Sequence, residues 1–110
     1  MPVSSAQKVE ALSVDFKSQA ALAELLGVSR SRVTRWLRGE GIDPRNAERV
    51  DLLELVMSSL MRLYEPAAAR AWLFGLNLHL GDRRPIDLVR AGKTEELMRA
   101  IRAERAGSFA

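Results

Sequence analysis

The stretch from Gln19 to Arg38 constrains the fold of this chain more than any other. It divides into two short predicted helices, 19–26 and 30–38, each preceded by a serine that can cap it. Gly27 lies between them and suits the left-handed conformation that ends a helix. Small or apolar residues occupy the positions where two crossing helices must touch: Leu22, Ala23, Leu26, Val28, Val33 and Trp36. This spacing predicts a helix-turn-helix.

The second helix of this motif carries a basic face. Four arginines and no acidic residue lie between Gly27 and Gly39. In helix-turn-helix proteins the second helix enters the major groove of DNA, where arginine, serine and threonine contact base edges or phosphates. The alternative is a solvated helix face, but such faces usually mix both signs of charge. The predicted DNA-binding residues are Ser29, Arg30, Ser31, Arg32, Thr34, Arg35 and Arg38.

Trp36 lies in the same helix at an inward position. Its indole offers a large apolar surface, so we expect it to anchor the core of the motif rather than to stack on a base. The two edges of the helix then have separate roles. The apolar edge holds the motif together, and the basic edge is left for DNA.

The rest of the chain also predicts helices. β-Branched residues are few, and no stretch alternates apolar and polar residues for long. Serines, prolines and glycines mark helix starts and stops. The further predicted helices cover 5–12, 44–64, 66–74, 85–91 and 95–107, with "SVDFKS" as a break and "LNLHLGDRR" as a loop. The fold class is therefore all-α.

The segment "GEGIDP" marks the expected boundary between two functional halves. It separates a helix-turn-helix region at 1–42 from a helical domain at 43–110, which we expect to serve partner binding and dimerisation. The second half opens with the longest predicted helix, in which Asp43 can cap the N-terminus and Pro44 suits the first position. The apolar stripe of this helix is wider than one neighbour would cover, which predicts contact with both a core and a partner.

Composition excludes several classes of protein. The chain has 110 residues, 47% of them apolar, so it can bury a core. It has no cysteine and a single histidine, His79, so neither a disulfide nor a zinc site is expected, and the chain fits the cytoplasm. No apolar run reaches the roughly 18–20 residues of a membrane span. We find no catalytic constellation and no phosphate-binding glycine loop, so we expect neither an enzyme nor a bound cofactor.

The segment "ARAWLFGLNLHLGDRRPIDLVRAGKTEELMRAI" resembles the toxin-binding domain of the Xre/MbcA/ParS antitoxins, and the likeness to the MbcA-like members extends over the whole chain. Tryptophan, asparagine, proline and glycine positions match together and in order. The matching residues are Trp72, Leu73, Asn77, Leu80, Gly81, Pro85, Ile86, Asp87, Leu88 and Gly92.

This resemblance implies a type II antitoxin. Its partners would be a RES-domain toxin that consumes NAD, and double-stranded operator DNA through which the complex represses its own operon. The antitoxin would act as a homodimer in a larger complex and would cover the mouth of the NAD pocket, largely with its C-terminal segment. The expected toxin-binding residues are Arg102, Arg105, Gly107, Ser108 and Phe109.

Two alternatives stay open at this point, one for Phe109 and one for the function of the chain as a whole. Phe109 has no obvious core to enter, yet a frayed terminus is nearly as well supported as a toxin contact. Trp72, Leu73, Phe74 and Pro85 are expected to serve internal packing and helix punctuation rather than partner binding. The chain as a whole fits a stand-alone dimeric repressor as the second function, and a neighbouring gene for a RES-domain protein would favour the antitoxin.

Overall fold

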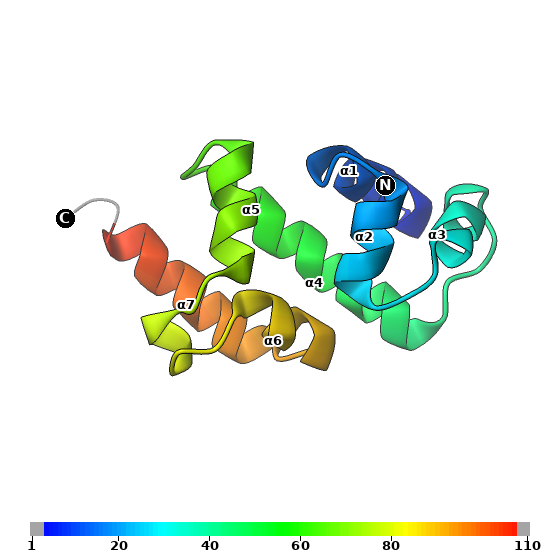
Figure 1. Cartoon of the computed structure of the whole chain (residues 1–110). Helices are drawn as coiled ribbons and strands as arrows, with labels where there is room; N and C mark the ends of the chain where they lie inside the picture. The colour runs from blue at the N-terminus through cyan, green and yellow to red at the C-terminus, as the bar shows by residue number, and fades with distance from the viewer. Residues whose placement is uncertain (1–3, 108–110) are drawn as a thin grey trace. The chain divides into compact units, whose positions relative to one another are not determined.

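The computed structural model describes residues 4–107, and helices make up most of them (Figure 1). Within this range there is no strand, only one isolated bridge between Asn77 and Arg83, so the predicted all-α class is confirmed. The helices are α1 Ser5–Asp15, α2 Gln19–Leu26, α3 Arg30–Leu37, α4 Pro44–Leu60, α5 Pro66–Phe74, the 3₁₀ helix η1 Leu78–Leu80, α6 Pro85–Ala91 and α7 Thr94–Gly107.

The chain divides into two compact units, Met1–Glu54 and Leu55–Ala110, and the division falls inside α4. The apolar stripe of this helix explains why it contributes to both. Its first half buries Val50, Leu52 and Leu53, and its second half buries a further set of apolar side chains, Val56, Met57 and Leu60. The functional boundary at 42/43 stays a prediction, because compactness alone does not show which residues each function needs.

The first unit contains the helix-turn-helix that the spacing predicts. Ser18 and Ser29 each accept a hydrogen bond from a backbone N–H in the first turn of the following helix, and Gly27 ends α2 with φ 72°. Helix α3 packs against both α1 and α2. The buried side chains that fill this core are Val9, Leu12, Phe16, Leu22, Leu25, Leu26, Val33 and Trp36.

Two predicted helix ends differ from the structure by more than one residue. Helix α1 continues to Asp15 rather than ending near Leu12, because the Ser13 hydroxyl donates to the carbonyl of Val9 at 2.9 Å and so lies within the helix without breaking it. Helix α4 ends at Leu60 rather than Tyr64. There the N–H of Leu63 bonds to the Leu60 carbonyl three residues back, which tightens the last turn.

The second unit is built from the end of α4, α5, η1, α6 and α7. Helix α6 packs against α5 and α7, and η1 packs against α7. Asn77 caps η1, since its side-chain oxygen accepts from the N–H of His79 at 2.9 Å, while its own N–H donates to the Arg83 carbonyl at 3.1 Å. The predicted loop therefore contains a 3₁₀ turn. The buried apolar residues of this unit include Leu73, Leu80, Ile86, Leu88, Val89, Leu97 and Ala100.

The expectation that Phe74 packs inside the protein was wrong. Leu73 is fully buried, but Phe74 is 46% exposed. Successive helical residues point about 100° apart, so the face of α5 that buries Ala69 and Leu73 turns Phe74 away from the core. Pro85 is buried as expected, and Trp72 is partly buried.

Replacing Trp36 tests the helix-turn-helix core. Its side chain is 4% exposed, so Trp36→Ala leaves a large cavity and should cost about 3–5 kcal/mol of unfolding free energy. Arg35→Ala, at the exposed position next to it, should stay within about 0.5 kcal/mol of the wild type. Urea unfolding of both variants measures the difference. Wild-type stability of Trp36→Ala would place the indole outside the core.

Asp43 makes one part of the stability depend on pH. Its carboxylate accepts from the Asn46 side-chain amide at 2.8 Å and from the Asn46 N–H at 3.2 Å, and the side-chain bond is the main cause of a lowered Asp43 pKa. A lowered folded pKa gives stability that is present above the unfolded value near 3.8 and is lost as the pH falls through the folded value.

Replacing this carboxylate therefore removes a pH-dependent contribution. Asp43→Asn should be less stable than the wild type at pH 7. The gap should narrow as the pH falls below the unfolded pKa near 3.8 and through the lowered folded pKa, where the wild-type carboxyl becomes protonated. Urea unfolding at pH 7 and pH 3 checks this, with exposed Glu40→Gln as the control. A gap that stays constant would contradict it.

Candidate functional site

The basic edge of α3 forms a shallow hollow of about 420 Å³ on the first unit. Its lining residues lie one, four, five and eight positions after Arg30, a spacing that gathers them on one helix face. They are Arg30, Ser31, Thr34, Arg35 and Arg38. All but the partly buried Thr34 are exposed. The structure therefore brings five of the seven predicted DNA-binding residues together.

The other two predicted residues lie beside this face. The Ser29 hydroxyl oxygen accepts from the N–H of Arg32 at 3.2 Å, so Ser29 caps the helix. Arg32 lines a separate hollow with Trp36 and Asp43. The pKa of Asp43 is lowered first by its hydrogen bond from Asn46 and, to a smaller degree, by the charge of Arg32. Arg32 is thus partly compensated by an acid of its own unit.

Thr34 is engaged by a residue that sequence reasoning missed. Its hydroxyl lies 3.0 Å from Oε1 of Gln19 and 3.1 Å from the carbonyl of Arg30, and its single proton can be donated to either. When it donates to Gln19, the Gln19 side chain is held by its oxygen and presents its NH₂ donors to a ligand. Residue spacing within one helix could not reveal this pair, because it joins two helices.

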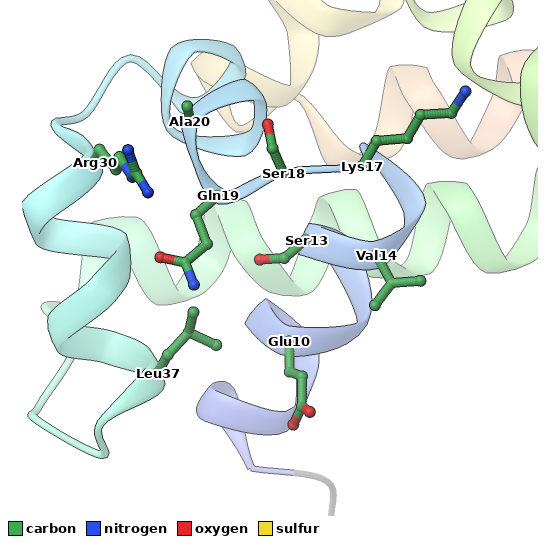
Figure 2. A pocket seen from close by; sticks show the side chains of 9 residues that line it. All are labelled: Glu10, Ser13, Val14, Lys17, Ser18, Gln19, Ala20, Arg30 and Leu37. Carbon is green, nitrogen blue, oxygen red and sulfur yellow. The ribbon is translucent and has the colours of Figure 1, made fainter.

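Gln19 lies in an open groove next to the basic face (Figure 2). The groove measures about 850 Å³ and is bordered by α1, the turn that follows it, the start of α2, and α3. Figure 2 shows the Gln19 side chain pointing into the space between α1 and α3, above Leu37. Arg30 lines both this groove and the hollow on α3, so the two surfaces are continuous. Cationic side chains and the N–H groups at the start of a helix suit a phosphate chain.

The second unit has a hollow of about 260 Å³ that includes two of the predicted toxin-binding residues, Arg102 and Arg105. We name it the arginine-rimmed pocket, and its full lining is Ser59, Arg62, Leu63, Met98, Ile101, Arg102 and Arg105. Gly107 is exposed and ends α7. Ser108 and Phe109 lie outside the described residues.

The second unit also exposes apolar side chains that the sequence did not single out. Leu76 is 73% and Leu78 85% exposed, beside the partly exposed Phe74. Leu55 in α4 and Met61 just after it belong to the apolar stripe whose width predicts a partner contact, and they are 45% and 40% exposed. Contiguous exposed apolar patches commonly mark protein interfaces.

The described part of the chain holds no group of three or more histidine, cysteine, aspartate or glutamate side chains that could bind a metal ion. Between residues 4 and 107 no helix has the length and apolar character needed to cross a membrane.

Comparison with known proteins places this chain among antitoxins. A helix-turn-helix family model (HTH_3) matches residues 17–51. The mycobacterial cidal antitoxins MbcA of Mycobacterium tuberculosis (strain ATCC 25618 / H37Rv) and Mycobacterium bovis (strain ATCC BAA-935 / AF2122/97) are each 30% identical to it over 89 residues, which is 80% of this chain and 79% of theirs.

A solved structure is similar along nearly the whole chain. It is the crystal structure of the M. tuberculosis MbcT–MbcA toxin–antitoxin complex, in which one chain matches with a TM-score of 0.76 and 27% identity over 96% of both chains. Sequence and fold thus agree over both units, and the chain belongs to the MbcA antitoxin family.

Proposed function

We propose that this protein is an antitoxin that binds and neutralises a RES-domain, NAD-consuming toxin and also binds operator DNA to repress its own operon. The observation that carries the proposal is the combination of two surfaces on one chain. One is the exposed basic face of α3. The other is the surface of the second unit that includes Arg102 and Arg105. The chain as a whole matches one chain of a toxin–antitoxin complex over 96% of its length. The site of action would be the cytoplasm.

For DNA, the basic face of α3 would enter the major groove. Arg30, Arg35 and Arg38 would contact base edges or phosphates, and Gln19 with the start of α2 would follow the sugar–phosphate backbone. A single helix-turn-helix contacts a short site, so we propose that a homodimer places two α3 helices on half-sites one DNA turn, about 34 Å, apart. The exposed apolar side chains of Leu55 and Met61 support the proposal of an interface between two copies of the chain.

For the toxin, the end of α7 would be the blocking element. Arg102 and Arg105 are exposed on this helix. Gly107 ends the helix and is followed in the sequence by Ser108 and Phe109. An aromatic side chain that fills a concave pocket can supply a large share of binding energy and exclude a ligand as large as NAD. This role is stoichiometric and needs no catalytic group on the antitoxin.

The alternative is a dimeric repressor without a toxin partner. Expression of the neighbouring gene with and without this protein separates the two, with growth and cellular NAD as the readouts. Protection supports the antitoxin, and growth that is unaffected in both cases supports the repressor.

Substitution of the basic face tests the DNA half. Arg30→Ala and Arg35→Ala should each weaken operator binding by about 1–3 kcal/mol in a sequence-dependent way if the side chain contacts a base. A phosphate contact would instead weaken all sequences alike and lower the salt slope by about one. Fluorescence anisotropy over a salt series distinguishes these outcomes. Arg45→Ala, an exposed arginine of α4 outside the hollow, is the matched control. Unchanged binding by the double variant would exclude α3 as the reading helix.

Removal of residues 107–110 tests the blocking element. The deletion begins at an exposed residue at the end of α7, so we expect folding to be preserved. At a concentration at which the full-length antitoxin inhibits the toxin completely, we expect the toxin to keep consuming NAD in the presence of the truncated antitoxin. The Arg30→Ala/Arg35→Ala variant is the control and should inhibit like the wild type. Equal inhibition by the truncated chain would assign the blockade to the body of the second unit.

A further inference from the structure

The arginine-rimmed pocket combines an apolar floor with an uncompensated positive rim. Ile101, Arg102 and Arg105 lie three, four and seven residues after Met98 on α7, so all four share one face. Leu63 adds an apolar side chain from the turn after α4. Leu63 and Met98 are only partly buried, and Ile101 is 6% exposed. The floor therefore offers apolar surface that a ligand could still cover.

The charge of the rim is not balanced within the described part of the chain. Other arginines of the second unit do have acidic partners: Arg83 pairs with Glu96, and Arg84 with Asp87. Among residues 4–107, Arg62, Arg102 and Arg105 take part in no ion pair.

The acid nearest in sequence is turned to another partner. Glu104 lies between Arg102 and Arg105 along the chain, yet its carboxylate accepts a hydrogen bond from the Tyr64 hydroxyl. The three guanidinium groups are thus left to solvent or to an external partner.

We propose that this pocket binds an acidic segment of the toxin that inserts one apolar side chain between Leu63, Met98 and Ile101. Carboxylates on either side of that side chain would pair with the guanidinium groups of Arg62, Arg102 and Arg105. The inference rests on the proposed function, because it takes the toxin as the partner, and it adds which chemistry of the toxin is recognised.

The form of the pocket favours this occupant over DNA. A phosphate chain uses the positive charge but leaves the apolar floor uncovered, whereas a protein segment can satisfy both. Guanidinium and carboxylate groups form paired hydrogen bonds with matching planar geometry. An apolar anchor in a pocket, ringed by polar contacts that exclude water, is the usual form of a strong protein contact. Complementary charge also speeds association, so the contact should be sensitive to salt.

Charge reversal on α7 tests the proposal in the full-length chain. The variant Arg102→Glu/Arg105→Glu places acidic groups opposite the expected carboxylates, and Kd for the purified RES-domain protein encoded beside this chain should rise about tenfold or more. Arg99→Glu is the matched control, since it changes an exposed arginine of the same helix that does not line the pocket. Its Kd should stay within about threefold of the wild type. Thermal unfolding of each variant shows that the fold is retained.

A salt series and a second variant separate the two parts of the pocket. Kd is measured between about 50 and 300 mM salt, a range that brackets physiological ionic strength, at which charges are screened over roughly 8 Å. Over this range the salt dependence of wild-type binding should be largely lost in the charge-reversal variant. Met98→Ala should weaken binding while the salt dependence remains. Arginine substitutions at acidic positions of the toxin should restore binding to the reversed variant.

Other outcomes overturn the inference. Equal toxin affinity of the charge-reversal and Arg99→Glu variants would exclude the pocket while leaving the antitoxin function intact. Loss of operator binding with unchanged toxin binding would assign the pocket to DNA. If the wild-type chain does not bind the RES-domain protein at all, the proposed function and this inference fail together.

Discussion

The burial of one edge of α3 against α1 and α2 is the interaction on which the DNA-binding geometry depends. Val33 and Trp36 remove that edge from water, and the helix cannot rotate without exposing them. The opposite edge is then fixed outward with Arg30, Arg35 and Arg38 on it. Because an arginine side chain is long and flexible, its reach into a DNA groove depends on how well the backbone beneath it is held. The apolar half of the helix supplies the rigidity, and in the proposed DNA complex the basic half would supply the specificity.

Helix ends were the most predictable part of the structure, because they depend on one or two residues each. Ser18, Ser29 and Gly27 have the backbone and capping roles that their types predict, and Pro66 and Pro85 each begin a helix. The error at the end of α1 has the same local origin. Ser13 was taken as a helix breaker, but a serine hydroxyl can bond back to the carbonyl four residues earlier and remain inside the helix.

The candidate sites were predictable only where one helix supplies all the residues. The five residues of the α3 hollow follow from helical periodicity alone. The Gln19–Thr34 bond and the position of Arg62 beside Arg102 do not, because each joins segments that are far apart in sequence. Similarly, Phe74 is apolar and adjacent to a buried leucine, yet its exposure depends on which face of α5 meets the core. Sequence shows which residues could bind, and tertiary packing decides which of them share a surface.

Both proposed surfaces follow one electrostatic rule. Arg83 and Arg84 of the second unit are each satisfied by a nearby acid, Arg84 by Asp87 at 3.1 Å. Around the α3 hollow and the arginine-rimmed pocket, guanidinium groups stand together without such a partner in the described chain. Clustered like charges repel one another in the free protein, and an anionic partner removes that repulsion. The free energy of binding an anionic partner would therefore include relief of the electrostatic repulsion between these arginines in the free protein. The pocket differs from the hollow in its apolar floor, and under the proposed function that difference would allow one chain to bind a nucleic acid on one unit and a protein on the other.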